Sequence, residues 1–230
     1  MSVIRRMSAA KHLWMLKRAN SLQPSSLLDV KQKLVALGPS LLPSILELLP
    51  HPEARPHAEE ILREILSNQT VGEFVAILSV APPSAVTHVI ELLSTSEKYD
   101  AVLLLELFPT APPKAKVSLE AILQRRAKSI PFSKLAACLG DNVKESRSLV
   151  YRLLELTGDP SVVAKLKSLL QNEDWWVRYH VLTLIGKFPS EDAIDAVKPL
   201  LRDGNKTVRL EAVRTLGKLD AHSAIPELCE

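Results

Sequence analysis

Glycine and aromatic residues are scarce in this sequence. Only 7 of its 230 residues are glycine and 4% are aromatic, whereas 47% are hydrophobic. Because aromatic residues favour strands and leucine favours helices, this leucine-rich composition predicts an all-α protein. The hydrophobic fraction and the small formal net charge of +3 exclude a disordered chain.

Cysteine is also scarce, and long apolar runs are missing. The two cysteines, Cys138 and Cys229, lie far apart and neither belongs to a CxxC pair. We therefore expect unpaired thiols in a reducing compartment and a cytoplasmic protein. The longest charge-free stretch, 74–90, is interrupted by Pro82 and Pro83 and is too short to span a bilayer as a helix.

Positive charge is concentrated near the N-terminus. The first twenty residues contain no acid and five bases: Arg5, Arg6, Lys11, Lys17 and Arg18. The segment superficially resembles an organelle transit peptide. Secretion is not expected, because the segment lacks the apolar core of a secretory signal peptide. We expect a basic amphipathic helix over residues 3–19. It either caps the first hairpin or attaches to an anionic surface such as a membrane or nucleic acid.

Internal repetition is the strongest signal in the sequence. A shift of 31 residues superposes three sets of similar residues: Arg147, Arg178 and Arg209; Val150, Val181 and Ala212; Leu154, Ile185 and Leu216. The same shift aligns a second set of apolar residues, Val163, Ile194 and Ile225. Apolar residues recur at helical spacing within each unit, and Pro, Gly, Asn or Asp falls between helices. Each unit is therefore predicted to be a helical hairpin.

The predicted hairpins repeat about every 30 residues along the chain. Longer helices are expected to begin near Glu53, Ser84, Pro113, Val143, Asp174 and Asn205. Shorter helices are expected at roughly 39–50, 70–80, 98–108, 131–140, 161–171, 192–202 and 222–230, with a further helix at about 25–37. Because one hairpin cannot bury its own apolar face, successive hairpins must stack. The predicted fold is an all-α, right-handed α-solenoid of about six hairpins, a single domain over 1–230 in which 1–20 is a basic N-terminal cap helix.

Two segments resemble a known family. DWWVRYHVLTLIGKF at 174–188 and NKTVRLEAVRTLGKL at 205–219 resemble the second helix of HEAT repeats, in the short form of phycobilisome-lyase-type HEAT proteins. EDAIDAVKPLLRD and HSAIPEL resemble the first helix of that repeat. The resemblance is specific over 142–230, whereas the first half lacks the Val-Arg pair of the second helix and matches in spacing and apolar pattern.

Arg147, Arg178 and Arg209 form an arginine ladder in the first turn of successive second helices. Stacking brings such residues to backbone carbonyls and to carboxylates such as Asp174, four residues before Arg178. The resemblance to HEAT repeats implies that the ladder braces neighbouring repeats, and the alternative is an anion-binding row. Recurrence of arginine favours bracing, because a planar guanidinium joins two acceptors.

Aromatic residues of the helix at 174–188 predict an interaction patch. At about 100° per residue, Trp175 and Tyr179 lie away from the apolar stripe. The 31-residue shift places residues of flanking helices beside them, so the predicted protein-binding patch consists of Trp175, Tyr179, Arg152, Leu210 and Arg214. Aromatic and arginine residues are enriched at interaction hot spots. The alternative is that the tryptophans pack against the adjacent repeat.

The sequence shows no catalytic constellation. Its six histidines fall outside HExxH motifs and zinc-spaced clusters, and it lacks the His-Glu dipeptide of HEAT-repeat iron hydroxylases. The best metal fragment, His57 with Glu60, has no second matching pair. Phosphate-binding glycine loops and a GxSxG motif are absent as well. We therefore expect no catalysis, no cofactor and no metal.

These observations favour a non-enzymatic protein-binding scaffold or adaptor that uses the concave face of the solenoid. Two enzymatic alternatives stay open. The lyase-type resemblance implies a bilin lyase or lyase chaperone, and HEAT-like repeats also build alkylpurine DNA glycosylases, whose aromatic, acidic and arginine residues have loose counterparts around Trp175.

Expectations about partners follow from charge and from the repeat pattern. Nucleic-acid binding is not expected, because residues 142–230 carry equal numbers of acids and bases. Membrane contact is expected only through residues 1–20. Ile225 and Leu228 repeat core positions near the C-terminal end, so we expect that the natural chain continues beyond Glu230 or that this end self-associates.

Overall fold

The computed structural model describes residues 3–140, 144–157 and 162–219. Over these ranges the secondary structure consists of α-helices, short 3-10 helices and connecting turns, without any strand, so the all-α prediction is confirmed. The helices pair into successive hairpins, as expected for an α-solenoid. The chain forms two compact units, Met1–Arg126 and Ala127–Glu230.

The first unit contains eight α-helices among its described residues: α1 (Val3–Leu16), α2 (Pro24–Leu37), α3 (Leu42–Leu46), α4 (Arg55–Ile65), α5 (Val71–Ile77), α6 (Pro83–Thr95), α7 (Val102–Leu107) and α8 (Pro113–Arg125). Two 3-10 helices, η1 (Ala19–Ser21) and η2 (Gly38–Leu41), precede α2 and α3. Proline stands at the start of α2, α6 and α8. It suits the first turn, where a backbone N–H has no helical acceptor and the fixed φ is already helical.

In the first unit, helices of successive hairpins pack against one another. Helix α2 packs against α4, α6 packs against α8, and α5 packs against both α7 and α8. The core between them is apolar and mostly aliphatic, with Leu34, Ile61, Phe74, Leu104 and Leu119 fully buried. Burial of this apolar surface is the dominant stabilising term of the unit.

The N-terminal helix α1 packs against α2. Among residues 7–16 of this helix, Ala9, His12 and Leu16 are buried, whereas Met7 and Trp14 are exposed. The exposed Trp14 ring lies 4.5 Å from the guanidinium carbon of Arg18. Within residues 7–16 of α1, the buried side chains therefore form one stripe at helical spacing, and Met7 and Trp14 lie outside it.

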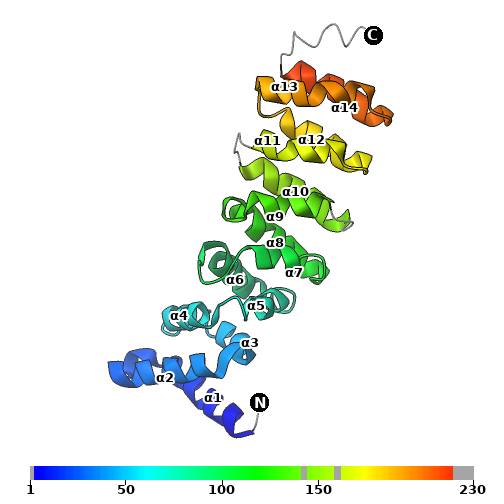
Figure 1. Ribbon diagram of the computed structural model, residues 1–230. Coiled ribbons are helices and arrows are strands. Elements are labelled where there is room, and N and C mark those ends of the chain that lie inside the picture. The colour runs from blue at the N-terminus through cyan, green and yellow to red at the C-terminus, as the bar shows by residue number, and fades with distance from the viewer. Residues whose placement is uncertain (1–2, 141–143, 158–161, 220–230) are drawn as a thin grey trace. The chain divides into compact units, whose positions relative to one another are not determined.

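The second unit begins with η3 (Ala127–Ser129), α9 (Phe132–Gly140) and α10 (Lys144–Thr157). It continues with α11 (Val162–Leu166), η4 (Lys167–Gln171), α12 (Trp175–Ile185), α13 (Glu191–Val197), η5 (Lys198–Arg202) and α14 (Lys206–Lys218). Helices α10, α12 and α14 stack in succession, and α11 and α13 lie along the other side (Figure 1). These three second helices are the layer that carries the predicted patch.

The predicted starts of the longer helices agree with the structure to within about two residues where it describes them, whereas the shorter helix predicted over 98–108 begins only at Val102. Asp174 and Asn205 are the N-cap residues of α12 and α14, and their side chains accept hydrogen bonds from the backbone N–H groups of Trp176 and Thr207. The predicted first helices 161–171 and 192–202 each divide into an α-helix and a 3-10 turn. In the second of these Pro199, which has no N–H to donate, interrupts the α-helical bonding. Val143 and the helix predicted over 222–230, with Ile225, Leu228 and Cys229, lie outside the described residues.

Candidate functional site

The arginine ladder connects each second helix to the loops around it. Arg178 donates from Nε and Nη2 to the two carboxylate oxygens of Asp203, at 2.8 and 2.9 Å. Its Nη1 also donates to the backbone carbonyl oxygens of Asn172 and Glu173, at 2.6 and 3.0 Å. One guanidinium therefore joins the loop before its own helix to the loop of the next repeat.

The other two ladder arginines make related contacts. Arg147 is buried and forms an ion pair with Asp174 of the following repeat. Arg209 donates from Nη1 to the carbonyl oxygens of Asp203 and Gly204, at 2.7 and 3.3 Å. The carboxylate contacted by Arg178 is thus Asp203 of the next repeat, while Asp174 contacts the arginine of the preceding one. This geometry braces adjacent repeats.

The arginine contacts affect the ionisation of Asp203. Its hydrogen bonds from Arg178 hold the pKa of the Asp203 carboxyl below its usual range, and the backbone N–H of Asn205 contributes to the same direction. The side chains of Arg178 and Asp203 are 15% and 8% exposed, so solvent screens the pair weakly.

Residues at i, i+4 spacing on the three second helices, together with Lys187 directly after α12, share corresponding positions of the repeat. We call this set the second-helix face, and its described members are Ser148, Arg152, Leu156, Trp175, Tyr179, Thr183, Lys187, Lys206, Leu210, Arg214 and Lys218. The 31-residue repeat sets their register, so Ser148, Tyr179 and Leu210 occupy one row. Arg152, Thr183 and Arg214 occupy the next row.

All five residues of the predicted patch belong to the second-helix face. Trp175 and Leu210 are 42% and 50% exposed. Arg152 and Arg214 are also exposed, and Tyr179 is half-buried. The structure therefore places the five on three adjacent helices, with four of them open to solvent.

Trp176, unlike Trp175, packs against the adjacent repeat, which was the alternative considered for the tryptophans. The Trp176 ring is half-buried and lies 5.4 Å from the guanidinium carbon of Arg147 on α10. It also packs against His180, with ring centroids 3.9 Å apart. Trp176 therefore fills the space between adjacent repeats, while Trp175 remains exposed beside it.

His180 is the centre of an aromatic cluster that sequence reasoning missed. Its ring lies 4.9 Å from the Tyr151 ring and 5.0 Å from the Tyr179 ring, both in edge-to-face geometry. Burial lowers the pKa of His180, and the carboxylates of Glu211 and Glu155 oppose that shift. Burial also raises the pKa of Tyr151. The cluster includes Tyr179 of the second-helix face and links it through His180 to Tyr151 on α10.

Glu211 is a second residue that the sequence reasoning missed. Its side chain is only 4% exposed, and it accepts a hydrogen bond from Thr183 Oγ1 at 3.1 Å. The shift of 31 aligns Leu149, His180 and Glu211, so a polar residue replaces an apolar one at a buried repeat position. That replacement was the signal that could have revealed both residues.

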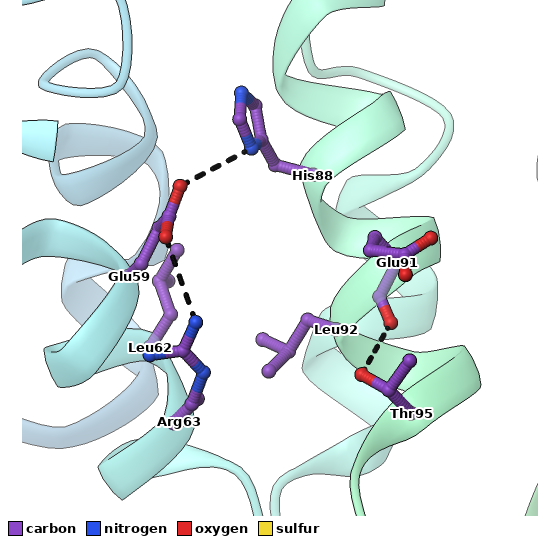
Figure 2. A pocket seen from close by; sticks show the side chains of 7 residues that line it. All are labelled: Glu59, Leu62, Arg63, His88, Glu91, Leu92 and Thr95. Atoms are coloured by element: carbon purple, nitrogen blue, oxygen red, sulfur yellow. Dashed lines mark hydrogen bonds and ion pairs between the residues drawn. The ribbon is translucent and has the colours of Figure 1, made fainter. Parts of the chain in front are cut away.

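Two pockets lie near polar side chains. One of about 280 Å³ lies at the start of α12 and is lined by Arg147, Ser148, Asp174, Trp175 and Trp176. The other, of about 110 Å³, lies between α4 and α6 of the first unit, where Leu62 and Leu92 face each other across it (Figure 2). Glu59 borders this second pocket and lies 3.5 Å from both His88 Nδ1 and Arg63 Nη2.

The candidate metal fragment is involved in a different interaction. Both carboxylate oxygens of Glu60 accept hydrogen bonds from Lys31 Nζ on α2, at 2.8 and 2.7 Å. His57 is half-buried on the same helix α4. Across residues 3–140, 144–157 and 162–219, no group of three or more His, Cys, Asp or Glu side chains has the arrangement needed to hold a metal ion.

Comparison with known proteins identifies the class of the C-terminal part. The family model for HEAT repeats matches residues 132–206 and 163–230, two overlapping segments that together contain α9 to α14. Residues 132–230 are therefore similar to HEAT repeats, in agreement with the HEAT resemblance of 142–230, and the match does not distinguish the short lyase-type form of the repeat. No curated protein gives a significant match to the sequence. Within the described part, every helix falls short of the length and apolarity that crossing a membrane requires.

Proposed function

We propose that this protein is a non-enzymatic scaffold or adaptor that binds a protein partner through the second-helix face. HEAT repeats form helical scaffolds that commonly mediate protein interactions, and this face belongs to the matched segment. Folds host many functions, so the proposal depends on the properties of the face itself.

The exposure of apolar side chains on successive helices is the observation that carries the proposal. Leu156 on α10, Trp175 on α12 and Leu210 on α14 are 47%, 42% and 50% exposed. Each of them has buried apolar neighbours on the same helix, so the helix does not need these three for its own packing. Exposed apolar groups in one surface favour association, because a partner removes them from water.

The layer beneath the face supports binding by keeping it rigid. The Arg178 and Asp203 pair joins α12 to the loop before α14, and the His180 cluster joins α10 to α12. A surface that is ordered before binding loses less conformational entropy when a partner docks. The face therefore suits recognition of a partner whose shape complements it.

The proposal also assigns a cellular compartment to the protein. It places the chain in a reducing compartment such as the cytoplasm, since neither Cys138 nor Cys229 stands in a CxxC pair. It involves no cofactor. Self-association near the C-terminal end is a separate proposal, motivated by Ile225 and Leu228, and sedimentation of the full chain over a range of concentrations tests it.

A capture experiment tests the binding function. The full chain is immobilised and compared with a Trp175→Ala/Tyr179→Ala variant in recovery of proteins from an extract of the source cells. Trp14→Ala serves as the matched control, because Trp14 is 56% exposed but lies on α1. We expect at least one protein to be retained by the parent chain and by Trp14→Ala and lost from the double variant. Equal recovery by all three chains would refute the proposed face.

Two assays address the enzymatic alternatives. Incubation with bilin followed by absorbance measurement tests lyase activity, and release of bases from alkylated DNA tests glycosylase activity. The scaffold proposal expects no change in bilin absorbance and no base release. A signal in either assay that disappears in the Trp175→Ala/Tyr179→Ala variant would replace the scaffold with an enzyme.

A further inference from the structure

Exposed carboxylates are missing from the described side chains of the second helices α10, α12 and α14, whereas exposed bases lie both on these helices and elsewhere in the second unit, as at Lys165 and Arg202. Every exposed charged side chain among the described ones of α10, α12 and α14 is basic, and so is Lys187 directly after α12. The exposed carboxylates of the described unit lie elsewhere, at Glu173 in a loop and at Glu191, Asp192 and Asp195 on α13. The equal numbers of acids and bases along 142–230 therefore conceal a basic face.

The two described carboxylates within the second helices, Glu155 and Glu211, are less exposed than the bases of this face. Glu211 Oε2 is 3.5 Å from Arg214 Nη1, and Glu211 Oε1 is 3.8 Å from Lys218 Nζ. The side chains of Arg214 and Lys218 are 68% and 53% exposed, against 4% for Glu211. Glu155 likewise pairs with Lys187 and is the less exposed partner, at 27% against 47%. An approaching molecule meets the bases first.

The exposed apolar residues alternate with these bases across the three helices. Trp175 shares its row with Lys206, and Leu156 shares its row with Lys187 and Lys218. Leu210 lies one turn before Arg214 on α14. Neighbouring packed helices lie roughly 8–10 Å apart, so an extended segment a few residues long can reach both apolar and basic groups of the face.

We propose that the second-helix face binds an acidic amphipathic peptide segment, in which Asp or Glu residues alternate with large apolar ones. The inference rests on the proposed function of this face and names the chemistry of its partner. Carboxylates of the segment pair with the guanidinium groups of Arg152 and Arg214, which form charge-assisted, bidentate hydrogen bonds. Its apolar side chains cover Trp175, Leu210 and Leu156.

The apolar component distinguishes this partner from a nucleic acid. A phosphate backbone would neutralise the bases, but it offers nothing to the exposed aliphatic groups of Leu156 and Leu210. An amphipathic peptide satisfies both kinds of group, since charge complementarity sets its orientation and apolar burial supplies affinity. The observations therefore favour an acidic peptide.

The test uses the full chain as bait for a display library of random peptides. We expect the retained sequences to be enriched in Asp and Glu together with Leu, Ile, Phe or Trp. A retained peptide is then labelled, and its dissociation constant is measured by fluorescence polarisation at increasing salt. Binding should weaken as salt rises, and a single-stranded oligonucleotide of equal charge should bind more weakly than the peptide.

Variants connect the binding to the face. Arg152→Gln/Arg214→Gln removes two exposed bases and should weaken peptide binding by about tenfold or more. Its melting temperature is measured alongside, because Arg214 also contacts the buried Glu211. Lys114→Gln, an exposed base on α8, is the matched control and should bind the peptide as the parent chain does. If Arg152→Gln/Arg214→Gln lowers the melting temperature, Lys206→Gln on the same face replaces it with the same expectation.

The outcomes separate this inference from the proposed function. Enrichment of basic or uncharged peptides, equal binding by Arg152→Gln/Arg214→Gln, or tighter binding of the oligonucleotide would overturn the acidic-peptide inference. If a protein is nevertheless captured in a Trp175-dependent manner, the scaffold function stands with a different partner chemistry. If neither peptide nor protein binding depends on the face, both proposals fail.

Discussion

Arg178 donates hydrogen bonds to both carboxylate oxygens of Asp203, which lies 25 residues further along the chain in the next repeat. The same guanidinium also holds two backbone carbonyls of the preceding loop. This arrangement satisfies loop carbonyls next to a helix start, where regular secondary structure supplies no donors. It explains why arginine recurs at this position of the repeat.

Loss of the Arg178 contacts should destabilise the second unit. We expect Arg178→Ala to lower the free energy of unfolding by about 1–3 kcal/mol, the range for hydrogen bonds to charged groups. Denaturant unfolding of the parent and the variant measures the difference. Lys114→Ala is the control, with an expected change within about 0.5 kcal/mol because its side chain is exposed. Unchanged stability together with lost partner binding would make the arginine a recognition residue.

Acid should weaken the same pair. Because Arg178 lowers the pKa of Asp203 in the folded state, the pair stabilises the fold fully above the unfolded pKa of about 3.9 and loses that contribution as pH falls through the lower folded value. We expect the stability difference between the parent chain and Arg178→Ala to be constant from pH 7 to 5 and to shrink below about pH 4. A difference that grows on acidification would contradict the assignment.

His180 provides a second test of the electrostatics. Burial lowers its pKa while Glu211 raises it, so Glu211→Gln should lower the pKa of His180 further. A folded pKa below the unfolded one favours the neutral ring, so this contribution to stability is present above the unfolded pKa of about 6.5 and is lost as pH falls below it. NMR titration of the imidazole protons in both chains measures the shift. A higher pKa in Glu211→Gln would show that the carboxylate does not act on His180.

Removal of residues 1–20 separates the two roles proposed for α1. Since Ala9, His12 and Leu16 are buried against the unit, we expect the truncated chain to melt at a lower temperature and to bind more of a dye for exposed apolar surface. An anchor without a capping role would instead leave the melting temperature unchanged and abolish binding to anionic vesicles or nucleic acid. Co-sedimentation with phosphatidylserine vesicles, at low and high salt, measures that binding.

The repeat period made most helix starts predictable from sequence. Prolines at 24, 83 and 113 and the capping residues Asp174 and Asn205 fix those starts locally, so no tertiary information is needed. The 3-10 ends of the first helices were harder to predict, because apolar spacing does not separate an α-helical turn from a tighter one.

The patch was predictable in position but not in chemistry. The period placed Arg152, Trp175, Tyr179, Leu210 and Arg214 on one face. The sequence did not reveal that Glu211 and Glu155 are less exposed than the bases with which they pair. A count of charges along the sequence contains no information about how exposed each side chain is. Likewise, His180 contacts rings from two helices, and the Tyr151 contact depends on how α10 and α12 approach each other.

Side-chain footprinting tests the central claim most directly. The full chain is oxidised briefly by hydroxyl radicals, alone and with a captured protein or a retained peptide, and modified residues are quantified by mass spectrometry. The account predicts that the partner reduces oxidation of Trp175, Tyr179 and Leu210 several-fold, while oxidation of Trp14 and of exposed Val80 stays the same. Protection of Trp14 or Val80 with Trp175 and Leu210 unchanged would contradict the second-helix face as the binding surface.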